Sequence, residues 1–179
     1  CALPIYPNGT LVTIDLATET ATIIGAMSDI RTRGLAFDPS SGILYSARTG
    51  GTQLLLAYDT TTGMDWVVGP LEHNANGLVY HPGLGLLLSA DSSSDQLISI
   101  DPRTGIESVI GTFGPFDNVS SLAYDPTSDL LFGTDNVTDE FYQIDPSTGA
   151  ATFIGSIGYN DVDNLTYIPA PGSIVFLTL

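Results

Sequence analysis

The segment Ile100-Asp101-Pro102-Arg103-Thr104-Gly105, followed five residues later by Ile110-Gly111, decides the fold because its pattern occurs four times along the chain. The other copies open with Ile14-Asp15, Tyr58-Asp59 and Ile144-Asp145, and close with Ile24-Gly25, Val68-Gly69 and Ile154-Gly155. Successive copies are about 43 residues apart in the 179-residue chain. A repeat of this period indicates a row of similar structural units that pack against their neighbours.

A second motif alternates with the first and reads Gly34-Leu35-Ala36-Phe37-Asp38-Pro39 in its first copy. The later copies span 77–82, 121–126 and 164–169. Between the motifs lie short apolar runs, bounded by Gly, Pro, Asp and Ser, that are too short for helices and lack their period. In the second unit these predicted strands are Leu78–Tyr80, Gly85–Ala90, Gln96–Ile100 and Ile106–Ile110.

Four strands in a unit of about 43 residues are typical of a β-propeller blade. We therefore predict one all-β domain over residues 1–179, a β-propeller of four four-stranded blades. The predicted units are 34–76, 77–120, 121–163, and a shared unit made from residues 1–33 and 164–179. The shared unit's two half-blades either close a ring within one chain, which we favour, or link subunits head to tail through exposed strand edges.

The Asp-Pro-x-Thr-Gly segments are predicted to be hairpin turns. The aspartate accepts a backbone N–H two residues further on, proline presets φ, and glycine takes a positive φ. This structural role explains the repeated aspartates without a catalytic one. The predicted turn residues are Asp15, Asp59, Asp101, Asp145, Gly63, Gly105 and Gly149.

The alternation of the two motifs resembles the bacterial secreted β-propellers of the YVTN and related families. The resemblance covers the whole chain and implies an exported propeller, in a fold that serves as scaffold, binder or occasionally enzyme. The segment Leu44-Tyr45-Ser46-Ala47 departs from the Tyr-Val-Thr-Asn signature, so the subfamily stays open. Residues 168–179 resemble the start of a PEP-CTERM sorting signal, although we favour a blade hairpin because Pro169 aligns with Pro39.

Charge and cysteine content exclude several classes of partner and site. The chain has 4 basic and 20 acidic residues, a net charge of −16, which disfavours nucleic acid and anionic membrane surfaces. No apolar run approaches the roughly 18 residues of a membrane span. The one cysteine, Cys1, excludes internal disulfides and cysteine-based zinc sites; it is either an acylated lipoprotein cysteine or an arbitrary boundary, and we favour the second.

No motif for nucleophilic, nucleotide-dependent or zinc chemistry appears, so we predict a non-catalytic protein with no certain cofactor. The loops opposite the hairpin turns should share one face, which collects arginines and carboxylates. Candidate ligand-binding residues are Arg31, Arg33, Arg48, His73 and Trp66. An Asp-x-x-x-Asp pattern recurs in two adjacent units, and its carboxylates could hold calcium or simply be solvated. These residues are Asp91, Asp95, Asp135 and Asp139.

Four Asn-x-Ser/Thr sequons suggest an exported glycoprotein, at the cell surface or outside the cell. The predicted acceptors are Asn8, Asn118 and Asn136, whereas Asn164 opens a predicted strand. We expect a structural or interaction module that self-assembles, into a surface layer or filament, through pairing of its half-blades. The alternative is a propeller that binds a glycan, such as an extracellular polysaccharide, or a small ligand, or a hydrolase or lyase, through the Arg/Asp loop face.

Overall fold

The computed structural model describes residues 9–15, 17–27, 31–158, 164–167 and 174–177. These residues form 16 strands, and the described part of the chain contains no helix. They build three four-stranded sheets and two two-stranded sheets, all antiparallel. The all-β propeller architecture predicted from the repeat is confirmed, and none of the described segments is a helix able to span a membrane.

Each complete blade contains four strands that are adjacent both in sequence and in space. The first blade consists of β3 (Thr32–Asp38), β4 (Ile43–Arg48), β5 (Leu54–Asp59) and β6 (Asp65–Pro70). The second consists of β7 (Ala75–His81), β8 (Leu86–Asp91), β9 (Gln96–Ile100) and β10 (Glu107–Thr112). The third consists of β11 (Val119–Asp125), β12 (Leu130–Asp135), β13 (Glu140–Ile144) and β14 (Ala151–Ser156). Short turns therefore suffice to connect the strands of a blade.

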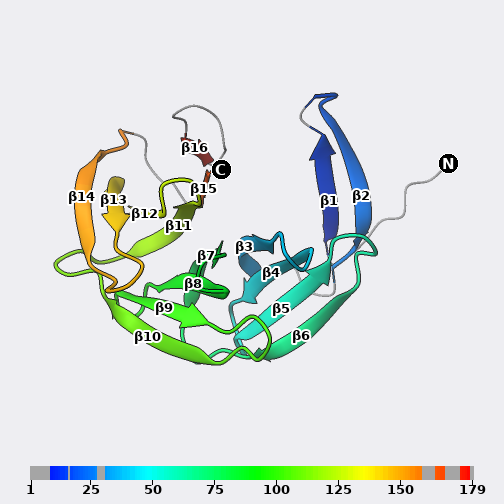
Figure 1. The fold of residues 1–179 in the computed structure, drawn as a ribbon, viewed down its shortest axis with the longest axis horizontal. Coiled ribbons are helices and arrows are strands. Elements are labelled where there is room, and N and C mark those ends of the chain that lie inside the picture. The colour runs from blue at the N-terminus through cyan, green and yellow to red at the C-terminus, as the bar shows by residue number, and fades with distance from the viewer. Residues whose placement is uncertain (1–8, 16, 28–30, 159–163, 168–173, 178–179) are drawn as a thin grey trace.

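The blades are arranged as an arc around a common centre (Figure 1). The first strand of each blade lies on the inside, where β3 packs against β7, β7 against β11, and β11 against β15 (Asn164–Tyr167). The fourth strands, β6, β10 and β14, lie on the outside. Inner strands of successive blades therefore line the centre of the molecule.

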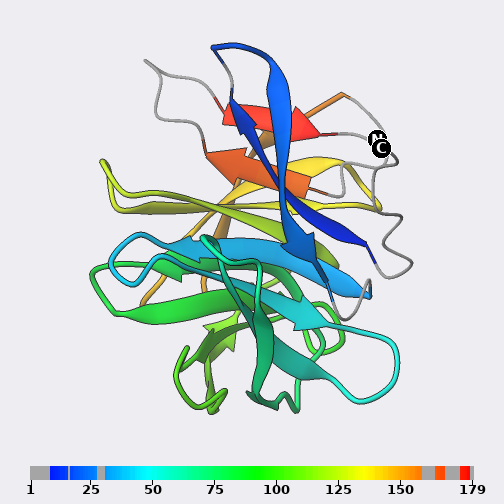
Figure 2. The same cartoon turned by 90° about the vertical axis from the view of Figure 1, so that its right-hand side faces the viewer.

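The shared fourth blade is present as two separate hairpins. At one end of the arc β1 (Thr10–Asp15) pairs with β2 (Thr20–Ala26), and at the other β15 pairs with β16 (Ile174–Leu177). The two hairpins belong to different sheets and stand apart in Figure 1; Figure 2 shows the molecule from the side of the β1–β2 hairpin. The closure within one chain that we favoured from the sequence is therefore not made by the described strands.

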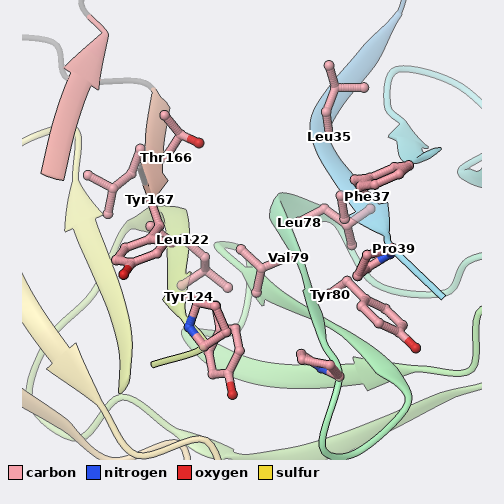
Figure 3. A pocket seen from close by; sticks show the side chains of 15 residues that line it. Leu35, Phe37, Pro39, Leu78, Val79, Tyr80, Leu122, Tyr124, Thr166 and Tyr167 are labelled. Carbon is pink, nitrogen blue, oxygen red and sulfur yellow. The ribbon is translucent and has the colours of Figure 1, made fainter. Parts of the chain in front are cut away.

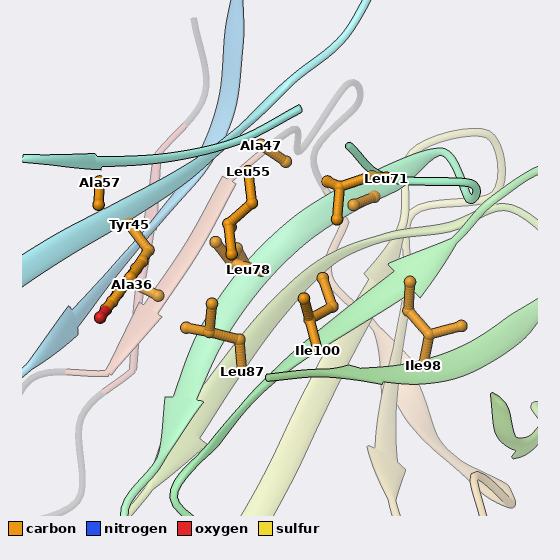
Figure 4. Packing of buried hydrophobic residues seen from close by; sticks show 11 residues of the cluster. Ala36, Tyr45, Ala47, Leu55, Ala57, Leu71, Leu78, Leu87, Ile98 and Ile100 are labelled. Carbon is orange, nitrogen blue, oxygen red and sulfur yellow. The ribbon is translucent and has the colours of Figure 1, made fainter. Parts of the chain in front are cut away.

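The hydrophobic core lies between blades as a series of layers. One layer joins the first two blades and includes Tyr45, Leu55 and Leu87, with Leu87 0% exposed (Figure 4). Its neighbour Leu88 points into the next layer, between the second and third blades, because successive side chains of a strand face opposite sides. A smaller layer packs Leu11 of β1 against the first blade.

A close approach between glycines joins the outer parts of neighbouring blades. A Cβ added to Gly63, in the β5–β6 turn, would lie 2.7 Å from Cα of Gly25 in β2. A Cβ on Gly69 would lie 2.5 Å from the carbonyl oxygen of Thr104, and one on Gly111 would lie 2.0 Å from that of Thr148. The repeated Ile-Gly or Val-Gly pairs therefore meet the Thr-Gly pairs of the turns across three junctions, where a side chain has no room.

The aspartates of the first motif hold the hairpin turns through hydrogen bonds. Asp59 Oδ1 accepts the backbone N–H of Thr61 at 2.7 Å, and Asp101 Oδ1 accepts that of Arg103 at 2.8 Å. Asp15 and Asp145 accept equivalent bonds from Ala17 and Ser147. The glycines that end three of these turns have φ values of 71° to 78°. These contacts give the repeated aspartates the structural role that the turn pattern predicts.

Turn carboxylates should make the fold sensitive to acid. A hydrogen bond from Ser128 is the largest reason that the pKa of Asp125 is lowered to about 2, and one from Thr61 lowers the pKa of Asp59. A lowered folded-state pKa stabilises the fold above about pH 4, and this contribution is lost as pH falls from about 4 towards about 2. We expect urea midpoints to be nearly constant above about pH 5 and to decrease over that acidic window. A constant midpoint down to about pH 2 would contradict this.

Candidate functional site

The inner strands surround an apolar cavity of about 410 Å³ at the centre of the arc (Figure 3). The second repeated motif builds its wall, since each copy contributes a leucine and an aromatic residue. These residues are Leu35 and Phe37, Leu78 and Tyr80, Leu122 and Tyr124, and Leu165 and Tyr167. The cavity thus combines one short motif from each of four inner strands.

The side of the cavity formed by β3 is exposed. Leu35 is 57% and Phe37 50% exposed, although both belong to the innermost strand of a blade. In Figure 3 they lie on the opposite side of the cavity from β15, which carries Thr166 and Tyr167. Large apolar side chains at a concave surface are typical of a binding site for a ligand or another protein.

Aromatic and charged groups form a network at the hairpin-turn end of the cavity. The His81 ring lies 4.4 Å from that of Tyr124, and the Tyr124 hydroxyl donates a 2.5 Å hydrogen bond to Asp129. Burial, followed by this hydrogen bond, raises the pKa of Tyr124 to about 12. His81 Nδ1 accepts the Leu84 N–H at 3.3 Å, and Nε2 lies 3.3 Å from Asp129 Oδ1. The network holds His81 of the second blade against Tyr124 of the third, and both nitrogens of His81 have a polar neighbour.

A second, polar cavity of about 500 Å³ lies at the other ends of the same inner strands. Arg33 Nη1 donates to Asn76 Oδ1 at 3.3 Å, and Asn76 Nδ2 donates to Ser92 Oγ at 2.5 Å. The hydroxyl oxygen of Ser120 is buried there and has no hydrogen-bond partner among the described residues. Asn136 completes this polar side of the cavity. Such groups suit a ligand rich in hydroxyl or carbonyl oxygens.

The five ligand-binding candidates do not converge. Arg33 lines the polar cavity; Arg31 donates to the Gly50 carbonyl at 3.3 Å and Arg48 to that of Thr52 at 2.8 Å, so both contact the β4–β5 loop. His73 Nδ1 lies 3.5 Å from Glu107 Oε2, away from the centre. Trp66 lies on the outer strand β6 and is 45% exposed. The structure therefore places these residues at separate positions.

Of the four aspartates suggested for calcium, Asp91 and Asp135 end β8 and β12, and Asp95 and Asp139 lie in the loops that follow. Asp91 accepts hydrogen bonds from Ser93 and Ser94, Asp135 accepts from Val137 and Thr138, and Asp95 accepts the Asn118 N–H. Asp139 has a positive φ of 56°. Within the described ranges, no group of three or more His, Cys, Asp or Glu side chains is placed to hold a metal. Calcium binding stays a prediction from the sequence.

The predicted glycosylation acceptors lie in different settings. Asn118 adopts a positive φ of 58° in the β10–β11 loop, and Asn136 contributes to the polar cavity. Asn8 and the single cysteine Cys1 lie outside the described residues. Glycosylation stays a prediction.

The second motif was not predicted to line a cavity, because its pattern was interpreted only as a sign of strands. The repeated Leu-x-aromatic spacing was the available signal: four copies on four inner strands necessarily meet at the centre of a propeller. The sequence indicated the polar cavity less clearly. Its only sign was the polar residues directly before copies of the second motif, such as Arg33 and Asn76.

Comparison with known proteins supports the fold. A chain in the crystal structure of a nidogen/laminin complex is similar, with a TM-score of 0.70 and 15% identity over 89% of this chain and 61% of that one. A structural genomics protein of unknown function from Bacteroides thetaiotaomicron has a TM-score of 0.63 and 14% identity over 83% of this chain and 38% of that one. No family model and no curated protein matches the sequence.

These similarities, together with the blades and the central cavity, define the class of the protein as a β-propeller. At 14% and 15% identity the likeness establishes the fold alone. The chain spans less than two thirds of each of these two neighbours.

Proposed function

We propose that this chain is a non-catalytic interaction propeller that acts outside the cell or at its surface, and that it binds partners at its open blade. The observation that carries the proposal is the separation of β1–β2 and β15–β16 into two hairpins, whose edges pair with no other described strand. Such an edge presents free N–H and C=O groups that another strand can complete. The exposed Leu35 and Phe37 add apolar surface beside the opening.

Several further features support this proposal. The net charge of −16 and the four sequons fit an exported protein. The similar chain of the nidogen/laminin structure belongs to a protein complex, which is a precedent for interaction by this fold.

Self-association is one form of this function to be tested, because one chain offers both halves of a blade. The β1 edge of one copy would then join the β16 edge of the next, and repetition would build a ring or a filament. Electron microscopy and light scattering of the purified chain distinguish such assemblies from monomers.

Deleting residues 173–179 removes β16 and leaves the edge of β15 exposed. If chains associate through half-blades, the deletion should abolish assembly and leave a soluble subunit with its three complete blades. Light scattering at several protein concentrations measures the first effect, and circular dichroism measures the second. A variant that assembles as well as the intact chain would contradict binding at this edge.

A second candidate function is binding of a hydroxyl-rich ligand such as an extracellular polysaccharide. The observation in its favour is the polar cavity, which both Arg33 and Ser120 line and where the Ser120 hydroxyl has no described hydrogen-bond partner. We expect Arg33→Ala to weaken binding of any oligosaccharide found on a glycan array about tenfold, the usual effect of losing a charged hydrogen bond. Arg103→Ala, in the β9–β10 turn, is the matched control and should leave binding unchanged.

A further inference from the structure

We propose that the open blade after β14 accepts a β-hairpin whose turn carries glycine, presented by another polypeptide, and that it discriminates against the chain's own N-terminal hairpin. This inference rests on the proposed binding at the open blade and specifies the partner. Its basis is a contact between glycines that recurs between neighbouring blades. Three pairs of glycines make this contact within the described chain, and a fourth glycine, Gly155, has no described partner.

Each occupied junction brings together the same two positions. The first is the glycine that follows the bulge of an outer strand, namely Gly25, Gly69 or Gly111. The second is the Thr-Gly end of the next hairpin turn, at Gly63, Gly105 or Gly149. Cβ atoms added to the turn glycines would lie 2.7 Å, 3.3 Å and 2.8 Å from backbone atoms of the partner glycine. Both positions therefore favour glycine for steric reasons.

Strand β14 offers the first half of a fourth junction. Its register shifts between Phe141 and Tyr142, so that Ile154 is the bulged residue and Gly155 follows it. This is the same arrangement as in β2, β6 and β10. Among the described residues, nothing lies within 4 Å of a Cβ built on Gly155. The surface that receives a turn glycine in the other junctions is thus formed, and no described residue covers it.

The chain's own N-terminal hairpin is poorly suited to cover it. Residue 19 occupies the turn position that is glycine in the three other copies, and here it is glutamate. Glu19 adopts a positive φ of 55°, close to the 71° to 78° of the turn glycines, so its backbone follows the same turn. Its Cβ and carboxylate would consequently point at Gly155 if this hairpin, from the same chain or a second copy, completed the blade.

The partner is therefore identified by chemistry: a β-hairpin with Asp-Pro-x-Thr-Gly or a related turn, able to pair with β16 and to place glycine on Gly155. Main-chain hydrogen bonds at the β16 edge supply affinity without regard to sequence, whereas the glycine contact supplies selectivity. Glu19 in turn acts against indiscriminate polymerisation of identical chains.

Three labelled synthetic peptides test the selectivity on the full chain by fluorescence anisotropy. The first contains residues 140–156, with glycine at position 149; the second contains residues 10–26; the third is the second with Glu19→Gly. We expect the first and third peptides to bind at least about tenfold more tightly than the second, as a steric clash at one contact would require. Gly155→Val in the chain should remove the difference among the peptides.

Because isolated hairpins are marginally stable, a second measurement uses the chain alone. Glu19→Gly in the full chain should increase self-association in light scattering, and Gly155→Val combined with it should reverse that increase. If the peptides bind but Glu19→Gly changes neither the affinity of the peptide 10–26 nor the association of the chain, the selectivity for glycine is overturned. The proposed binding of a partner at the open blade is then unaffected. If no peptide binds and neither variant changes association, the inference and the proposed partner binding both fail.

Discussion

Replacing Gly111 with valine should lower the free energy of unfolding by about 3 kcal/mol or more, since overpacking against fixed backbone is at the costly end of core substitutions. The added Cβ would lie 2.0 Å from the carbonyl oxygen of Thr148, which belongs to a hydrogen-bonded turn and cannot rotate away as a side chain would. The third blade must therefore shift relative to the second. Urea denaturation followed by circular dichroism measures the change.

Gly155→Val is the matched control, because Gly155 occupies the same position after a bulge but has no described atom within 4 Å of its added Cβ. Its free energy of unfolding should change by less than about 1 kcal/mol, as for an unobstructed surface site. Equal losses for the two variants would mean that the glycines serve the bulge itself and that the contact between blades is energetically unimportant.

Replacing Leu88 with alanine should lower the free energy of unfolding by about 2–5 kcal/mol. Leu88 is 0% exposed and lies in the layer between the second and third blades, together with Leu122 and Tyr142. Removing its side chain leaves a cavity that sheets on both sides cannot easily close, because each is fixed by its own hydrogen bonds. Thermal and urea unfolding measure the loss.

Leu84→Ala provides the control for that experiment. Leu84 lies in the β7–β8 turn of the same blade and is 52% exposed, so its truncation should change stability by less than about 0.5 kcal/mol. A loss below about 1 kcal/mol for Leu88→Ala would show that the layers between blades contribute less than their burial indicates.

The bounds of a strand could be predicted where its apolar pattern alone matches the residues that pair with the neighbouring strand. Gln96–Ile100 was predicted with the bounds that β9 has, because polar residues bound an apolar run on both sides. The predicted strand Leu78–Tyr80 is shorter than β7, Ala75–His81. A register shift between Asn76 and Leu78 interrupts the alternation of side chains there, and such a bulge depends on the partner strand.

The site was less predictable, because its residues meet only through the arrangement of blades. The sequence marked Arg31 and Arg48 as ligand contacts, but nearby loop carbonyls of Gly50 and Thr52 accept their hydrogen bonds. Conversely, Phe37 looked like an ordinary strand residue, although it is 50% exposed beside the central cavity. The departure at Glu19 was visible in the repeat, yet its meaning requires the contact between Gly25 and Gly63.

The placement of the hydrophobic layers between sheets has a consequence for how the molecule comes apart. Each blade is stabilised chiefly by its immediate neighbours, so the chain behaves as a one-dimensional array with coupling from one unit to the next. The β7–β10 sheet has large buried layers on both faces, whereas the β1–β2 hairpin has one small layer. Local opening should therefore begin at the ends and leave the middle sheet as the last cooperative unit, so that terminal hairpins can exchange without unfolding of the centre.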